Sequence, residues 1–245
     1  MAKPKILYDN RLNGTLVASS TASGYNVAYL RDLKPFTWFK AVSLPATVTR
    51  DEGSAKSADY ALIYGEAGTY EIRASTDNFS ASDVLLGTIT LTKTAFGLAL
   101  FTSVSYRYWR VKQTGAGTPP AYSIAMIGVG LEMPRHLTAG FDPVGRMVHS
   151  QTNRSEKGHV LGTVTDFEEW SQSLSFRKPL KTWVDDTFQP AWTAHLRDLP
   201  FAFAWDTDDY PDVVYWVKAG DKFSAPHIAG PYCSHLEFEV SGRIL

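Results

Sequence analysis

The residues best suited to metal binding or nucleophilic catalysis are scattered along this chain. Its six histidines fall in neither HxH nor HExxH spacing, so each is interpreted as a surface or loop residue. They are His136, His149, His159, His195, His227 and His235. Cys233 is the only cysteine, which excludes an internal disulfide and a CxxC zinc site, and we expect it to be packed in a strand. We therefore predict no metal and no cofactor.

The acidic residues give no catalytic pair either. The densest cluster, 206–212, lacks the central glycine and the distal glutamate of an EF-hand loop, which favours a solvated turn. Glu168 and Glu169 are adjacent, so in a strand they point to opposite faces and cannot share a substrate. There is no GxSxG elbow and no GxxxxGK[ST] loop, and the glycines of 115–117 are followed by Thr-Pro. We expect no catalytic residues, and a hydrolase is the least favoured hypothesis.

Composition narrows the class of protein further. The chain has 245 residues with 24 Lys+Arg and 25 Asp+Glu, and this balance argues against broad or sequence-specific nucleic-acid binding. Hydrophobic residues make up 44%, enough for a packed core, and aromatic residues make up 13%, which favours strands and large interfaces. No apolar run reaches the ~18 residues of a membrane span, and no signal core follows the start. We expect a protein made in a cytoplasm, soluble there, without membrane insertion.

The first half reads as short strands separated by turns. Residues 106–111 alternate aromatic or aliphatic with basic side chains, which predicts one buried and one charged face. The other expected strands are 46–49, 60–64, 70–74, 84–86, 88–91 and 122–133. Strands at this spacing predict a jelly-roll β-sandwich over 1–133, with no long helix within 47–111.

The second half, 134–245, combines strands with one helix. Expected strands are 160–165, 169–177, 201–205, 213–217 and 236–240. Between them, apolar residues from Leu180 to Leu199 recur at three-to-four spacing, which predicts an amphipathic helix that buries aromatic side chains against a sheet. Pro190 lies inside this pattern, so the helix either kinks there or begins there. The expected fold class is mainly β: a jelly roll followed by a second β-sandwich with one packed helix.

The first domain resembles the discoidin-like, galactose-binding jelly roll. The matching pieces are Leu30-Arg31-Asp32, the stretches 36–39 and 47–54, Ser75-Thr76-Asp77 and, above all, 106–111. The resemblance implies core and loop-anchoring roles for these residues. Glu52 departs from the pattern, because it replaces the usual apolar residue before Gly53. The resemblance implies the fold and leaves the ligand open, since the binding loops of that family vary freely.

The second domain resembles the ring-forming domain of bacteriophage distal tail proteins, which share a fold with tail-tube subunits. The resemblance rests on the order of elements: 154–158, the strand through Trp170 and Phe176, the helix ending at 195–197, then 199–206 and the closing 238–242. The usual distal tail protein has its ring domain first and its carbohydrate-module-like domain second. Here the order is reversed.

Together these resemblances imply a structural subunit of the phage tail tip or baseplate, assembled in the bacterial host cytoplasm and found in the virion. The implied partners are the chain itself as a ring (a hexamer, with a trimer as the other option), the tail-tube subunit, the hub and other tail-tip proteins, and a host-surface glycan. The alternative function is a carbohydrate-binding module for host attachment, with Trp38 or Tyr64 stacking on sugar, although such aromatics are more often core.

DNA that leaves a phage must pass through the tail, and Lys and Arg side chains on the inner wall of a ring would bind its phosphates. We therefore expect the lumen of the ring to be acidic or neutral. The candidate lumen-facing residues are Glu168, Glu169, Asp206, Asp208 and Asp209. The competing interpretation places them in ordinary solvated turns on the outer surface.

Overall fold

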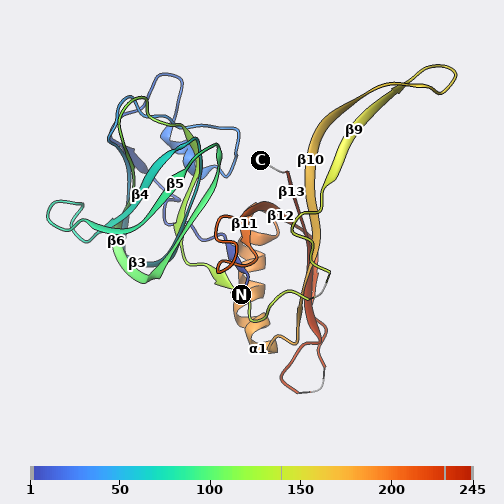
Figure 1. Cartoon of the computed structure of the whole chain (residues 1–245). Coiled ribbons are helices and arrows are strands. Elements are labelled where there is room, and N and C mark those ends of the chain that lie inside the picture. Colours follow the sequence, from blue (N-terminus) through green and yellow to red (C-terminus); the bar gives the residue numbers. More distant parts are fainter. Residues whose placement is uncertain (1–2, 139, 229, 244–245) are drawn as a thin grey trace. The chain divides into compact units, whose positions relative to one another are not determined.

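A computed structural model describes residues 3–138, 140–228 and 230–243, and it is mainly β, as the sequence predicts. The chain forms two compact units (Figure 1). The N-terminal unit comprises Leu7–Leu131 with Tyr210–Val214, and the C-terminal unit comprises the chain up to Ile6, Glu132–Asp209 and everything from Tyr215 on. The first strand, β1 (Lys5–Leu7), joins the sheet of the C-terminal unit, although it precedes the jelly roll in sequence.

The N-terminal unit is built around two long antiparallel strands. Its elements are β2 (Leu16–Ala18), the 3₁₀ helix η1 (Val27–Arg31), β3 (Ala46–Gly65), β4 (Gly68–Ser75), β5 (Val84–Leu91), β6 (Ala95–Thr114) and β7 (Tyr122–Gly128). The sheet order is β2-β3-β6-β4-β5, and β7 pairs with the second half of β3. The ladder between β3 and β6 is irregular between Asp51 and Lys56 and again between Ala58 and Tyr60, so both strands serve both layers of the sandwich.

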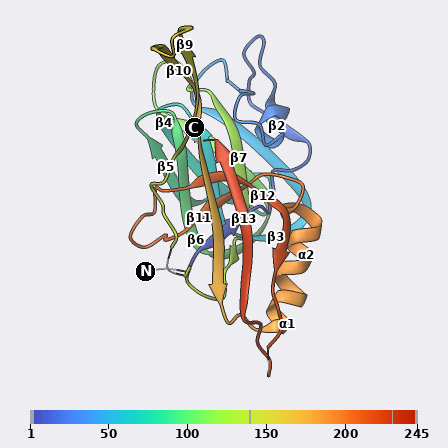
Figure 2. The same cartoon turned by 90° about the vertical axis from the view of Figure 1, so that its right-hand side faces the viewer.

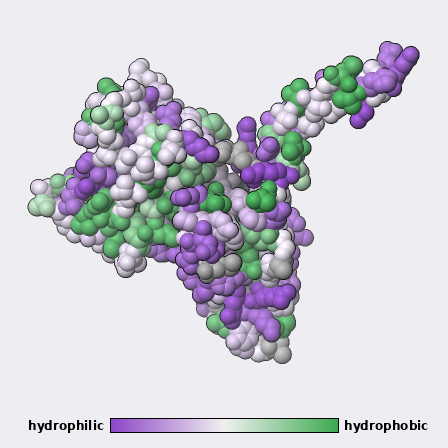
Figure 3. Space-filling model, in the orientation of Figure 1, coloured by the Kyte–Doolittle hydropathy of each residue, from purple (hydrophilic) through white to green (hydrophobic). Residues whose placement is uncertain are grey.

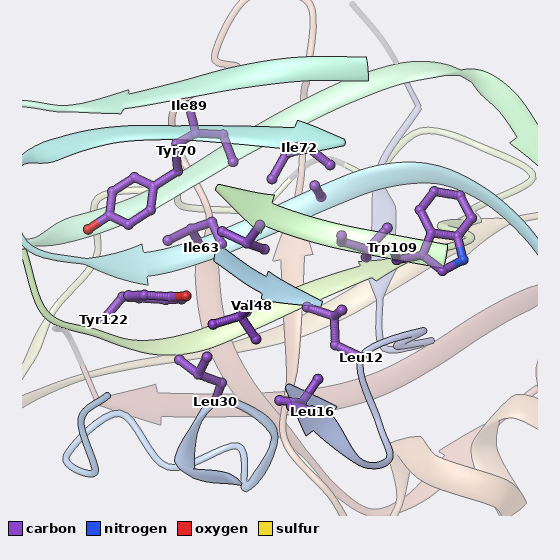
Figure 4. Close-up of a cluster of buried hydrophobic side chains, with 14 of the residues drawn as sticks. Leu12, Leu16, Leu30, Val48, Ile63, Tyr70, Ile72, Ile89, Trp109 and Tyr122 are labelled. Atoms are coloured by element: carbon purple, nitrogen blue, oxygen red, sulfur yellow. The ribbon is translucent and has the colours of Figure 1, made fainter. Parts of the chain in front are cut away.

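The core of this unit lies between the two layers (Figure 4). Val48 and Ile63 come from the two halves of β3, and Ile72 and Trp109 face them from β4 and β6. All four are at most 1% exposed. The alternation of side chains along a strand explains which residues enter the core. Along β3, Ala46 and Val48 are buried, whereas the threonines between and after them are partly exposed.

The Ser75-Thr76-Asp77 segment fixes the loop after β4. The buried Ser75 hydroxyl donates to Asp77 Oδ1 (2.8 Å), and the Asp77 carboxylate accepts from the backbone N–H groups of Ser80, Ala81 and Ser82. The Arg110 guanidinium from β6 lies 3.5 Å from the ring centroid of Phe79 in the same loop. These contacts give the segment the loop-anchoring role that the resemblance implies.

The C-terminal unit is one seven-stranded sheet with a helix on one face (Figures 1 and 2). Its order is β8-β1-β11-β12-β13-β10-β9. The bounds of these strands are β8 (Leu131–Glu132), β9 (Met147–Arg154), β10 (Val160–Arg177), β11 (Phe201–Ala204), β12 (Tyr215–Ser224) and β13 (His235–Arg243). Along β10, Trp170, Leu174 and Phe176 are buried on the helix side, which confirms the alternation predicted for 169–177.

The helix runs from Lys181 to Leu196 as α1 (Lys181–Trp183), the π-helical turn η2 (Val184–Phe188), α2 (Gln189–Ala191) and the π-helical turn η3 (Trp192–Leu196). Phe188, Trp192 and Leu196 are at most 5% exposed, as the three-to-four spacing predicts. Pro190 lies in its interior, so the alternative in which the helix begins at this proline is wrong. Wide π turns flank the proline, and the backbone stays helical through it. No helix among the described residues is long and apolar enough to cross a bilayer.

Candidate functional site

The most exposed feature of the C-terminal unit is a two-stranded ribbon that projects beyond its sheet. We call residues 147–168, which comprise β9 and the outer part of β10, the arm. β13 pairs with β10 only from Glu169 to Arg177, so in the described chain the outer part of β10 pairs with β9 alone. The ribbon turns at its tip through Gly158 (φ +80), and Ser155 N–H donates to the His159 carbonyl (2.8 Å). The arm therefore has two open strand edges.

Apolar side chains line the arm although no other described part of the C-terminal unit covers them. The exposed apolar residues of the arm are Met147, Val148, Val160, Leu161, Val164 and Phe167, at 39–71% exposure. In the space-filling view they form hydrophobic patches along the projection (Figure 3). A two-stranded hairpin alone is marginally stable in water, and apolar area left in water forgoes about 25 cal/mol per Å². The arm therefore has the composition and edges of a contact surface for another chain.

The base of the arm is held by an aromatic cluster. Trp170 and Tyr215 stack with ring centroids 4.2 Å apart, and Phe141 packs edge-on against Trp170. Trp170 Nε1–H donates to the Asp142 carbonyl (3.1 Å), and the Tyr215 hydroxyl donates to the Pro143 carbonyl (2.5 Å). Burial raises the pKa of Tyr215, which keeps the hydroxyl protonated as a donor. These contacts fix the segment that leads into β9.

Glu168 and Glu169 lie at the base of the arm on opposite faces, as their adjacency predicts. The Glu169 carboxylate contacts the His149 ring, with Oε2 and Nε2 3.0 Å apart. The same His149 ring stacks on Phe167. Glu168 lies 3.7 Å from the Arg146 guanidinium. Glu168 is therefore engaged in an ion pair and Glu169 in a contact with the His149 ring, and their position in a lumen stays a prediction.

The other predicted lumen residues belong to the turn that follows β11. The Asp206 side chain is 1% exposed, and its Oδ1 accepts from the N–H groups of Asp208 (3.1 Å) and Asp209 (3.3 Å). Asp206 is thus the buried organiser of the turn, which removes it from the surface of this chain. Asp208 and Asp209 are exposed. The structure therefore separates these five carboxylates into two groups. Among the described residues, no cluster of His, Cys, Asp and Glu is arranged to hold a metal ion.

Of the two aromatic residues suggested for sugar stacking, Trp38 is partly buried and Tyr64 is buried. Tyr64 is only 7% exposed, and it packs between Trp38 and Phe96 at centroid distances of 5.7 and 4.6 Å. Tyr64 is therefore a core residue, which corrects its assignment as an exposed stacking ring. More exposed rings lie before β3, in η1 and the loops around it, where Phe36 is 73% exposed and Tyr25 and Tyr29 are 38% and 36% exposed.

Strand β9 has no counterpart in the sequence prediction. Met147–Arg154 is mostly polar after its first two residues, and it lacks the alternation that marks a half-buried strand. Both faces of a projecting ribbon meet solvent in a single chain, so no alternation is required. The only local sign is the Ser-Glu-Lys-Gly turn at 155–158, which joins two segments of similar length.

No protein-family model and no curated protein sequence matches this chain. The solved structures that are similar to this chain include carbohydrate-binding modules. Chitosan-binding module 1 of a chitosanase/glucanase from Paenibacillus sp. IK-5 has 22% identity and a TM-score of 0.42, covering 48% of this chain and 97% of that chain. The module CpGH89CBM32-5 from Clostridium perfringens, in complex with GalNAc-β-1,3-galactose, has 13% identity and a TM-score of 0.43, covering 49% and 99%. The CBM32 module of AlyQ, in complex with 4,5-unsaturated mannuronic acid, has 20% identity and a TM-score of 0.43, covering 49% and 97%. Likeness at this level says nothing about what this chain binds.

Proposed function

We propose that this chain is a structural subunit of a homo-oligomer, in which the arm of each copy lies against the arms of its neighbours. The observation that carries the proposal is the combination of uncovered apolar side chains and two open edges on one ribbon. A partner that covers only one edge would leave the other open.

Other copies of the same chain can cover both edges of the ribbon. Each ribbon contributes two edges of equal length, so each copy needs one neighbour on either side. Identical subunits that each contact two neighbours through different surfaces form a closed ring when the rotation closes. Strand pairing across the contacts would then convert the separate ribbons into a continuous barrel without edges. The formal net charge of −1 leaves little general repulsion between copies.

A finer proposal is that this ring belongs to the tip of a phage tail, coaxial with the tail tube. Its support is the resemblance of the second domain to distal tail proteins, together with the helix that leads directly into β11 and an acidic turn. A hexamer is the proposed stoichiometry. Glu168, Glu169, Asp208 and Asp209 remain its candidate lumen residues, and the described surface of this chain offers them near the arm base and the turn after β11.

The test compares the mass of the whole chain in solution with that of two exposed-residue variants. We expect size-exclusion chromatography with light scattering to give an oligomer for the wild type, and electron microscopy to show rings. The double variant Leu161→Ser/Val164→Ser should be monomeric without loss of folded stability, because both side chains are solvent-exposed in a single copy (71% and 61%). The control is Val42→Ser, which alters an equally exposed residue (63%) of the N-terminal unit and should leave the oligomer intact. A wild type that stays monomeric at the highest attainable concentration contradicts the proposal.

A second candidate function is carbohydrate binding by the N-terminal unit, and the exposed aromatic side chains before β3 favour it. Phe36, Tyr25 and Tyr29 offer aromatic faces to solvent, and such faces stack on the apolar side of sugar rings. A glycan array probed with the whole chain tests this function. Binding that is lost in Phe36→Ala and kept in Val42→Ser supports it, whereas an array without signal for the wild type contradicts it.

A further inference from the structure

An open cavity of about 340 Å³ lies at the end of β10 opposite to the arm. Cross-strand pairs form its floor, because Ser175 pairs with Glu237 and Arg177 pairs with His235 on the face of the sheet away from the helix. Backbone hydrogen bonds close its sides: Thr138 N–H donates to the Ser175 carbonyl (2.9 Å), and Lys178 N–H donates to the Ser234 carbonyl (3.1 Å). The wall is therefore built from three separate segments, and every side chain in it is polar or charged.

The positive charges of this cavity are not neutralised within the described chain. Neither Arg177 nor Lys178 takes part in an ion pair with a described residue. Glu237, by contrast, accepts from the Ser173 hydroxyl (2.8 Å) and lies 3.7 Å from His235 Nε2. The cavity is thus lined by two cations and one carboxylate. The Arg177 guanidinium has five N–H donors and the Lys178 ammonium has three, whereas Glu237 is the only carboxylate in the described lining.

The backbone of Lys178 is in the left-handed region, with φ at +48. This conformation costs free energy for a residue with a side chain, and glycine would adopt it with less strain. A lysine at this position therefore places a charge at the rim at the expense of local stability. Hydroxyl groups complete the wall, since Ser175 and Ser234 lie beside the two cations, and the Ser234 hydroxyl is 2.9 Å from His235 Nδ1.

We propose that this cavity binds a small polyol that carries one anionic group, of the chemical class of sugar phosphates and sugar acids. The Arg177 and Lys178 side chains hold the phosphate or carboxylate, for which charge-assisted hydrogen bonds are the strongest available. The Glu237 carboxylate and the Ser175 hydroxyl bind the hydroxyl groups of the ligand. A volume of about 340 Å³ falls in the range of small-molecule sites and exceeds what a lone phosphate fills.

Calorimetric titration of the whole chain with four probes tests the inference: glucose 6-phosphate, glucuronate, glucose and inorganic phosphate. We expect glucose 6-phosphate or glucuronate to bind more tightly than glucose and inorganic phosphate, with affinity that falls as salt is raised. The preference between the two charged sugars distinguishes a phosphate from a carboxylate ligand. Equal binding of inorganic phosphate and glucose 6-phosphate would overturn the polyol part of the proposal.

Three variants locate the site. Lys178→Gly keeps the backbone conformation and removes the charge, so it should weaken binding about tenfold or more while the chain becomes no less stable. Arg177→Gln should weaken binding similarly. The control Lys222→Gln removes an exposed charge outside the cavity and should leave binding unchanged. Absence of binding by every probe, or unchanged binding in both cavity variants, would refute the proposed site.

Discussion

Trp170 and Tyr215 stack with an interplanar angle of 18°, and each donates a hydrogen bond to a carbonyl of the segment that enters the arm. Trp170 is on β10 and Tyr215 begins β12, so the pair joins two strands of the sheet to the Asp142-Pro143 backbone. The arm is therefore an extension of a fixed base, whereas its outer part leaves apolar side chains exposed in a single copy.

Replacing Tyr215 by phenylalanine tests this clamp. Tyr215→Phe keeps the stacked ring and removes the hydroxyl that donates to the Pro143 carbonyl. We expect the free energy of unfolding to fall by about 1 kcal/mol, the usual net contribution of one hydrogen bond. Urea titration measures the loss, and hydrogen exchange should show faster exchange in β9. Unchanged exchange in β9 would mean that the clamp does not order the arm.

The helix of the C-terminal unit should be essential for its stability. Phe188 and Trp192 both contact Phe238 of β13, with centroids 5.3 and 5.9 Å apart. Because both rings are buried, Phe188→Ala or Trp192→Ala should each cost about 3–5 kcal/mol in thermal or urea unfolding. Trp183→Ala is the matched comparison, since Trp183 is only partly buried, and it should cost clearly less. Equal melting temperatures for all three variants and the wild type would contradict this packing.

A surface ion pair in the N-terminal unit gives a pH-dependent contribution. Arg107 donates to both Asp51 oxygens at 2.8 Å, and with the Gly53 N–H it lowers the pKa of Asp51 from 3.8 to about 2. Since the folded-state pKa is depressed, the contribution is present above pH 3.8 and is lost as the pH falls toward about 2.

Asp51→Asn should therefore flatten the pH dependence of stability in that window, measured by urea unfolding at a series of pH values. Arg107→Gln breaks the same ion pair by removing the guanidinium that donates to Asp51. The double variant should behave like Asp51→Asn alone, and additive effects of the two substitutions would show that they do not act through this pair.

Local patterns were sufficient for several elements that bury one face within the chain. The alternation around Trp170 and Phe176 predicted the inner part of β10, and the spacing from Leu180 to Leu199 predicted the helix. The strands predicted separately at 46–49 and 60–64 are joined in β3, which continues through Gly53 with a positive φ of 73° and an irregular ladder.

What sequence patterns could not predict depends on contacts between distant segments. β1 pairs with β11, nearly 200 positions later in the chain, and no local signal marks that partner. Of the two strands of the arm, the one in β10 was predicted over 160–165, whereas β9 was missed because it buries nothing within one copy. The buried role of Asp206 and the core position of Tyr64 follow from tertiary packing, which residue type alone does not specify.

Hydrogen exchange of the whole chain at low and high protein concentration tests the proposed assembly most directly. If arms of neighbouring copies pair along their edges, the backbone amides of Met147–Arg154 and of the outer part of β10 should become protected as concentration rises. The amides of β7, which are buried within one copy, should be protected equally at both concentrations. Protection of the arm that grows with concentration is the predicted result. Arm amides that exchange equally fast at every concentration, in a sample that light scattering shows to be oligomeric, would contradict the account.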